Sequence, residues 1–377
     1  MVVAASLVVV AGTVAGVLAA FDDGGRTSGE AGSPEVSASP RPAPPPAVPT
    51  PSAPATTVSA PPSPSPSARR TTTPTPSKPV KKRERRTAAA GRLHRHPDSQ
   101  VLEWVRSHSG DARHAVIASR IAEQPAAVWF ADYSPDTVTA RVAAVTSGGA
   151  ALGRVPVLVP YAIPGRDCGG HSQGGAPGLD AYDAWIDRFA AGLGLGEVIV
   201  VLEPDSLAQA ECLSAGERAD RFASLARAGR ALKAANPRAR VYFDAGHSGW
   251  NAPGKQAAWL RQAGAASPES SDGIFSNVSN FHTTADEMAY DRRVLDALGG
   301  PASLGAVIDT SRNGNGAPAD GEWCDPAGRK LGRTPTLGTG EARIDAYLWV
   351  KLPGESDGCK GRPGTFTASY AYDLASS

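Results

Sequence analysis

Seven short apolar runs, rich in β-branched residues, recur along the C-terminal three-quarters of the chain. They lie at 127–130, 155–161, 198–202, 241–243, 273–278, 306–308 and 346–350. Most are separated by stretches with the apolar period of an α-helix, for example 179–195 and 215–235. Continuous apolar strands that alternate with helices predict buried parallel strands in βαβ units. About seven such repeats in about 280 residues favour an α/β fold built as a distorted seven-stranded parallel β/α barrel over an open sheet.

The first 21 residues carry no charge and are dominated by Val, Ala and Leu. This stretch is just long enough to span a bilayer, and it equally fits the apolar core of a signal peptide with small residues at Ala19 and Ala20. We favour a cleaved signal peptide over a retained anchor. Either reading places the rest of the chain outside the cytoplasm, secreted or held at the outer face of the membrane, with membrane contact only through residues 1–21.

Residues 22–97 are expected to form a disordered linker. Between about residue 31 and residue 80 the chain is almost entirely Pro, Ser, Thr and Ala, and a basic run follows at 81–86. Such a composition buries too little apolar surface to offset the entropy of ordering, and its proline content favours an extended spacer. The catalytic domain is therefore predicted to occupy residues 98–377.

Charge and motif content exclude several classes of function. The formal net charge is +1, but residues 1–99 hold 12 basic and 6 acidic residues, so 26 basic and 31 acidic residues remain for the body. A mildly acidic body argues against a nucleic-acid partner. The chain has no HExxH, no glycine-rich phosphate loop and no convincing Ser-His-Asp arrangement. We expect a monomer that needs no cofactor.

The chain contains four cysteines, Cys168, Cys212, Cys324 and Cys359. No CxxC pair is present, so a zinc site has little support. An even number in an exported protein suggests two disulfides. Of the three pairings we favour Cys168–Cys212 with Cys324–Cys359, which close loops of about 35–45 residues, each worth roughly 4 kcal/mol in the chain-entropy model. Four free buried thiols are the alternative.

Polar and aromatic residues follow each apolar run. In a parallel barrel these positions meet at the carboxyl end of the sheet, where active sites lie. A single Asp at such a turn is by default a helix cap, but several acidic residues at one rim favour a functional site. The acidic residues expected to converge there are Asp167, Asp205, Asp244 and Asp357.

Grouped carboxylates can bind Mg²⁺ or Ca²⁺, or they can perform acid/base chemistry on a glycosidic bond. The rim also carries the aromatic side chains Trp129, Tyr161, Trp250 and Trp323. Flat rings suit the C–H faces of sugars, and a metal site has no need of them. We therefore predict glycoside hydrolysis without a metal.

This chemistry needs one carboxylic acid that stays protonated near neutral pH. Asp205 follows a dry strand, and Asp167 is the neighbour expected to raise its pKa by like-charge repulsion. Asp357 would stay ionised beside Lys351 and polarise a water molecule.

Seven runs in order resemble glycoside hydrolase family 6, a family of cellulases, over about residues 98–377. The runs are 159–168 (VPYAIPGRDC), 202–207 (LEPDSL), 244–250 (DAGHSGW), 277–281 (NVSNF), 309–314 (DTSRNG), 322–324 (EWC) and 349–358 (WVKLPGESDG). The resemblance implies a distorted seven-stranded barrel and hydrolysis with inversion at the anomeric carbon.

Matched motif by motif, the resemblance gives Asp205 the place of the general acid and Asp167 that of the residue that tunes it. Asp357 takes the place of the candidate base, with a water relay as the alternative. Ser172, in the loop 169–175, is expected to position that water, and Tyr161 is counted with the catalytic residues. Glucan-binding places fall on Trp129, Arg166, His247, Trp250, Asn280, Trp323, Lys351 and Glu355. The family's usual disulfides coincide with the pairing favoured above.

The chain departs from the family pattern at two positions. Asp325 stands where Asn usually follows Trp-Cys, and Leu352 stands where a basic residue or Pro is common. We expect neither to touch a catalytic carboxylate. Structural readings compete at three others: Asp244 as a cap of the next helix, Asp309 as the partner of Arg312, and Trp349 as a core residue.

Loop length predicts the mode of action. Exo-acting members of the family roof the cleft with long loops, whereas only eight residues separate Asn313 from Glu322. This predicts an open cleft and an inverting endo-β-1,4-glucanase acting on β-1,4-glucan polysaccharide or cello-oligosaccharides. The alternatives are a cellobiohydrolase of the same family or a non-catalytic glucan-binding wall protein.

Overall fold

The computed structural model describes residues 92–376. The predictions for residues 1–91, namely the signal or anchor and most of the linker, lie outside the described residues. Among the residues described, no helix is both long and apolar enough to cross a membrane. The division of the chain into 1–21, 22–97 and 98–377 stays a prediction.

Seven parallel strands form one sheet in chain order, with β1 and β7 at its edges. They are β1 (Val128–Phe130), β2 (Val157–Pro160), β3 (Val198–Leu202), β4 (Ala239–Asp244), β5 (Gly273–Ser276), β6 (Gly305–Asp309) and β7 (Ile344–Leu348). Every neighbouring pair is parallel. The predicted seven-stranded α/β fold is confirmed, as a curled half-barrel.

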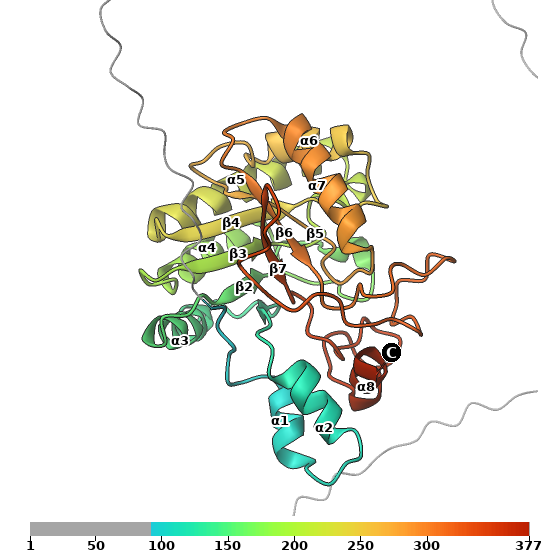
Figure 1. The fold of residues 1–377 in the computed structure, drawn as a ribbon. Coiled ribbons are helices and arrows are strands. Elements are labelled where there is room, and N and C mark those ends of the chain that lie inside the picture. Colours follow the sequence, from blue (N-terminus) through green and yellow to red (C-terminus); the bar gives the residue numbers. More distant parts are fainter. Residues whose placement is uncertain (1–91, 377) are drawn as a thin grey trace, which may run out of the picture. The chain divides into compact units, whose positions relative to one another are not determined.

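Helices follow most strands and cover the outside of the sheet (Figure 1). They are α3 (Val138–Ala151), α4 (Leu179–Ala191), α5 (Ala215–Ala235), α6 (Pro253–Gln262) and α7 (Thr284–Leu298). A second group, drawn below the sheet in Figure 1, comprises α1 (Gln100–Ser107), α2 (His114–Ile117), the adjoining π-helix η1 (Ala118–Ala122) and α8 (Ala368–Ser376). These last four pack on one another through an apolar cluster that includes Trp349, which is core as expected.

Local signals in the sequence explain the sharpest boundaries. Helix α5 begins after Ser214, whose side chain accepts the N–H of Glu217 while Glu217 bonds back to the Ser214 N–H. This capping box satisfies two free donors and fixes the first turn. Strand β5 begins at Gly273, and this position requires glycine because a Cβ there would lie 1.8 Å from the Gly305 carbonyl oxygen.

The inner face of the sheet is filled by side chains that alternate with those packed against the helices. The inner cluster comprises Val159, Ile199, Val201, Tyr242, Phe275, Val307, Leu348 and their neighbours. Leu93 joins it and pairs with Val155 in a parallel bridge. The chain just before residue 98 is thus packed in this unit.

Both favoured disulfides, Cys168–Cys212 and Cys324–Cys359, are present. The first joins short 3₁₀ turns after β2 and β3, η2 (Asp167–Gly169) and η3 (Ala210–Cys212). The second joins the long connection between β6 and β7 to the segment that follows β7. Each disulfide therefore ties together two loops at the carboxyl rim.

Two acidic residues, Glu287 and Asp291, are fully buried on the inner face of α7. Glu287 Oε1 accepts the Ser248 N–H at 2.8 Å, and Asp291 Oδ2 accepts the Ser276 hydroxyl at 3.1 Å. Their other oxygens, Glu287 Oε2 and Asp291 Oδ1, have no partner among the described residues. Burial, followed by the charge of Glu287, raises the pKa of Asp291, and burial also raises the pKa of Glu287. At a pH between the unfolded and the folded pKa values, the folded pair therefore retains a proton that the same groups lose in the unfolded chain.

We predict that Asp291→Asn stabilises the protein more at pH 8 than at pH 5. Because the folded pKa of this pair is raised, its contribution to the free energy of unfolding is fully present below the unfolded pKa. That contribution is lost as the pH rises through the folded pKa. Asn keeps the shape, removes one titrating group and can donate to Glu287. The unfolding temperature of the variant, measured by calorimetry, should exceed wild type by roughly 2–4 °C at pH 8 if about 1 kcal/mol is relieved. A difference that is the same at both pH values would contradict this account.

Candidate active site

A cavity of about 1120 Å³ lies at the carboxyl ends of the strands. All predicted catalytic and substrate-binding residues line it: Trp129, Tyr161, Arg166, Asp167, Ser172, Asp205, His247, Trp250, Asn280, Trp323, Lys351, Glu355 and Asp357. Asp244 was expected at the same rim, but it is buried and does not line the cavity. Three of the four grouped carboxylates therefore face the same space.

The turn after β3 presents Asp205. Glu203 and Asp205 both adopt left-handed backbone conformations, with φ of 49° and 69°, which are uncommon for residues other than glycine. Glu203 is fully buried, and its carboxylate accepts the backbone N–H groups of Ala162 and Ile163 at 2.9–3.0 Å. This anchor ties the end of β3 to the end of β2 and holds the unusual turn in place.

The surroundings of Asp205 favour its protonated form. Burial raises its pKa to about 8, helped first by the charge of Asp244 and then by that of Asp167. We had named Asp167 as the main neighbour, and the structure gives Asp244 the larger charge effect. The buried Asp244 accepts the N–H groups of Leu207 and Ala208 in the turn after Asp205. The competing reading of Asp244 as a cap of the next helix is wrong, because α6 begins after Ala252 and has no side-chain cap.

A chain of hydrogen bonds joins Asp205 to Asp167. The Tyr161 hydroxyl donates to Asp205 Oδ2 at 3.3 Å and lies 3.1 Å from the Ser172 hydroxyl. Ser172 Oγ and Ser172 N both donate to Asp167 Oδ2, at 2.9 and 2.7 Å. Arg166 supports the chain, because its Nε donates to the Ser172 carbonyl at 2.8 Å and its guanidinium lies over the Tyr161 ring. The predicted residues thus form one connected unit.

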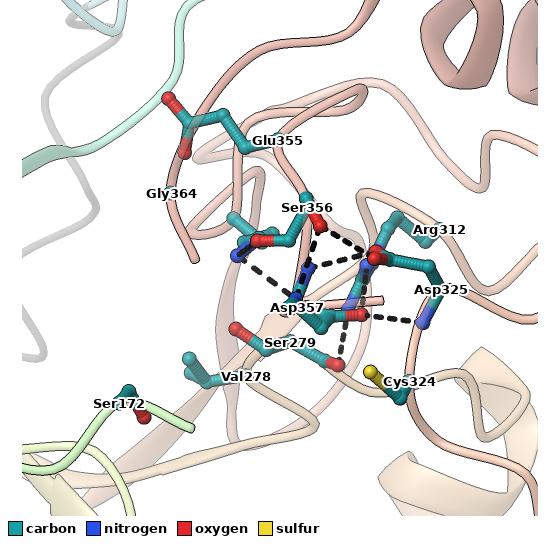
Figure 2. Close-up of polar contacts among 12 residues, drawn as sticks. Ser172, Val278, Ser279, Arg312, Cys324, Asp325, Glu355, Ser356, Asp357 and Gly364 are labelled. Carbon is teal, nitrogen blue, oxygen red and sulfur yellow. Dashed lines mark hydrogen bonds and ion pairs between the residues drawn. The ribbon is translucent and has the colours of Figure 1, made fainter. Parts of the chain in front are cut away.

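Asp357 lies in a separate cluster of charges (Figure 2). Its Oδ2 accepts from Arg312 Nη1 at 2.7 Å and from Asp325 N at 3.1 Å, while its Oδ1 lies 3.4 Å from Lys351 Nζ. Two expectations are corrected here. Asp325 does touch a catalytic candidate, and Arg312 pairs with Asp357 rather than with Asp309.

Asp309 has another structural role. Its carboxylate accepts the backbone N–H groups of Ser279, Ser311, Val350 and Lys351 at 2.9–3.3 Å. These donors come from the loops after β5, β6 and β7. Asp309 therefore fixes the main chain on which Lys351 stands.

Aromatic rings line both sides of the cavity. Trp129 meets the Tyr161 ring edge-on at 5.3 Å, and its indole N–H donates to the Val350 carbonyl. On the opposite side His247 lies 5.2 Å from Trp250. Burial, followed by the nearby His282, lowers the pKa of His247 to about 3, so this imidazole is neutral.

Trp323 is the most exposed of these aromatic side chains, with 53% of its surface accessible. Its ring lies 5.6 Å from that of His171, in the loop 169–175. Trp323 therefore contacts the loop 169–175, which carries Ser172.

The sequence motifs missed one wall of the cavity. Residues from the first described segment, among them His96, Asp98 and Gln100, line it beside the segment after β7. Gln100 Nε2 donates to Glu355 Oε1 at 3.1 Å and to the Gly364 carbonyl at 2.7 Å. Gln100 lies in none of the seven runs, so no sequence signal marked it.

No group of three or more His, Cys, Asp or Glu side chains in residues 92–376 is arranged to hold a metal ion. The carboxylates are instead engaged by N–H donors, by hydroxyl groups and by the cations of Arg312 and Lys351. The arrangement suits proton transfer at a polar substrate with flat apolar faces.

Residues 88–373 match the model of Glycosyl hydrolases family 6. The chain is 53% identical over 279 residues to Endoglucanase 1 of Streptomyces sp. (strain KSM-9), which covers 74% of this chain and 76% of that relative. It is 49% identical to Endoglucanase A of Thermobispora bispora over 74% of this chain and 60% of that relative.

The fold is also similar to a solved structure, the endoglucanase Cel6 from Mycobacterium tuberculosis in complex with methyl-cellobiosyl-4-deoxy-4-thio-β-D-cellobioside. The TM-score is 0.71 with 39% identity, over 77% of this chain and 98% of that one. With the half-barrel and the carboxylate rim, these matches show that the chain belongs to glycosyl hydrolases family 6 and is a glycoside hydrolase.

Proposed function

We propose that this protein is an endo-β-1,4-glucanase that hydrolyses internal bonds of cellulose-type glucans with inversion. The observation that carries the proposal is Asp205, a carboxylic acid whose pKa is raised to about 8 and which lines the same cavity as Asp357 and several aromatic side chains. The endoglucanases among its relatives support the same substrate class.

In this proposal Asp205 donates its proton to the glycosidic oxygen as the bond from that oxygen to the anomeric carbon breaks. Water attacks the anomeric carbon from the other face, which inverts its configuration. Asp357, which forms ion pairs with Arg312 and Lys351, stabilises the positive charge that develops on the sugar. The water transfers its proton toward Asp167 through the Ser172 hydroxyl.

The aromatic side chains and the polar groups of Asn280, Lys351, Glu355 and Arg166 are assigned to binding the glucan. Burial raises the pKa of Glu355 to about 7, against the opposing effects of Lys351 and Gln100. Glu355 is therefore available to hydrogen-bond sugar hydroxyl groups in either protonation state. Stacking on Trp129, Trp250 and Trp323 would set the register of the polymer.

Location and assembly are part of the proposal. Two disulfides in the described chain are typical of proteins that work in an oxidising compartment. With the predicted signal peptide or anchor at residues 1–21, they support a secreted or surface-held monomer.

We predict that Asp205→Ala loses nearly all hydrolysis of polymeric glucan and still binds it. Loss of a general acid typically costs about 10²–10⁴-fold in rate, whereas the aromatic binding surface stays intact. Reducing-sugar release and a pull-down with insoluble glucan measure the two properties. Asp220→Ala, on the exposed face of α5, is the matched control. Hydrolysis by Asp205→Ala at the wild-type rate would refute the mechanism.

The alkaline limit of kcat/KM should lie near pH 8. Asp205 must be protonated to act, so activity is present below its pKa of about 8 and is lost as pH rises through it. Asp167→Asn removes a neighbouring negative charge, and the limit should then shift to lower pH even though the rate also falls. An alkaline limit that stays at the same pH in the variant would show that Asp167 does not tune the acid.

On carboxymethylcellulose we expect viscosity to fall early, while few reducing ends have formed. Only eight residues lie between Asn313 and Glu322, and the relatives with the highest identities quoted above are endoglucanases. Unchanged viscosity with cellobiose as the sole product would instead establish the cellobiohydrolase alternative, a name carried by more distant relatives.

A further inference from the structure

Asp325 is a buried acidic residue beside the active site, with 3% of its surface exposed. Its Oδ1 accepts the Asp357 N–H at 2.7 Å. Its Oδ2 accepts the Ser356 hydroxyl at 2.6 Å and the N–H groups of Cys359 and Lys360 at 3.0 and 2.8 Å. Four donors from one short loop thus converge on a single carboxylate (Figure 2).

The contact between Asp325 and Asp357 is reciprocal. The N–H of each residue donates to the carboxylate of the other. Asp325 also has a left-handed backbone conformation, with φ of 50°, which directs its N–H toward Asp357. Main chain and side chain together therefore fix both the position and the orientation of the Asp357 carboxylate.

Backbone dipoles stabilise the charge of Asp325. No Lys or Arg side chain forms an ion pair with it in the part of the chain that the structure describes. Burial alone would raise its pKa, but the bonds from Ser356 and from the three N–H groups outweigh burial and hold the pKa below its usual value. Convergent N–H groups of this kind form an anion-binding nest, and here the anion is a side chain of the protein itself.

The neighbouring disulfide does not perform the same task. Cys324–Cys359 joins the same two loops, but Cys359 lies two residues beyond Asp357, whose carboxylate is contacted by Arg312, Lys351 and the Asp325 N–H. The disulfide limits the separation of the loops. Asp325 sets the direction in which Asp357 points.

We propose that Asp325 is a positioning residue for Asp357, and that the loop 356–360 requires a carboxylate at this position to hold Asp357 against Arg312. The inference rests on the proposed function, in which Asp357 stabilises developing charge.

Asn is usual at this position in the family, but in this chain an amide would not satisfy the four donors that the Asp325 carboxylate accepts. If the Asn oxygen faced Ser356, Cys359 and Lys360, its NH₂ group would face the Asp357 N–H, donor against donor. The opposite orientation would set the NH₂ group against three donors. Either way a buried N–H of the loop loses its acceptor, which is costly for a buried donor, and Asp357 shifts.

The test compares Asp325→Asn with wild type on a soluble cello-oligosaccharide. We expect kcat to fall about 10- to 100-fold, since small misplacements in an active site can cost that much, while KM changes by less than about threefold. Asp320→Asn, an exposed residue of the same loop that makes the same change of charge, should match wild type. A kcat within twofold of wild type, or a rise in KM alone, would overturn the proposal.

A second arm tests the requirement for a carboxylate. Asp325→Ala leaves three N–H groups around a space that fits formate, so formate should restore kcat severalfold in this variant and not in Asp325→Asn. Failure of formate to restore kcat would overturn that requirement. If neither variant folds, Ser356→Ala removes only the hydroxyl donor and should lower kcat modestly, and a wild-type kcat there would count against the proposal.

Crystal structures make the outcome independent of the proposed function. In Asp325→Asn the contact between Arg312 Nη1 and Asp357 Oδ2, 2.7 Å in the wild-type chain, should be lost. Its retention would overturn the proposal even if wild type proved inactive on glucan. Assays of wild type and Asp205→Ala in parallel show separately whether the proposed function fails.

Discussion

Buried carboxylates that accept backbone N–H groups from a neighbouring loop hold the whole rim together. Glu203, after β3, accepts from the loop after β2, and Asp244, at the end of β4, accepts from the turn after β3. Asp309, at the end of β6, accepts from the loops after β5 and β7. A carboxylate is costly to bury without such donors. The same bonds that make its burial possible therefore fix the separations of the loops around the cavity.

Asp205 differs from these carboxylates, because within residues 92–376 its carboxyl group accepts a hydrogen bond from one side chain, that of Tyr161. The Asp205 carboxyl group is buried and lies near two acidic residues, Asp244 and Asp167. Because few donors offset these effects, its protonated form is favoured. The Asp357 carboxylate, by contrast, lies next to the cations of Arg312 and Lys351 and accepts the Asp325 N–H. The different roles proposed for Asp205 and Asp357 thus correspond to how many donors each carboxyl group receives.

The loops that carry these residues depend on cross-links between distant parts of the chain. Two disulfides, the Asp325 nest and the Gln100 contacts each connect a segment of the rim to another that is remote in sequence. The connection from β6 to β7 contains no helix in the structure. Its course is therefore set by these polar contacts and by Cys324–Cys359 rather than by regular secondary structure.

The sequence alone determined the order and type of strands, the favoured disulfides and the motif residues that line the cavity, because apolar periodicity and contiguous motifs are local properties. It could not reveal that Asp325 touches Asp357, that Arg312 pairs with Asp357, or that Gln100 meets Glu355, which is 255 residues away. Nor could it rank Asp244 above Asp167 as the neighbour of the acid. These depend on distances and burial between segments far apart in the chain, and only the tertiary structure brings those segments together.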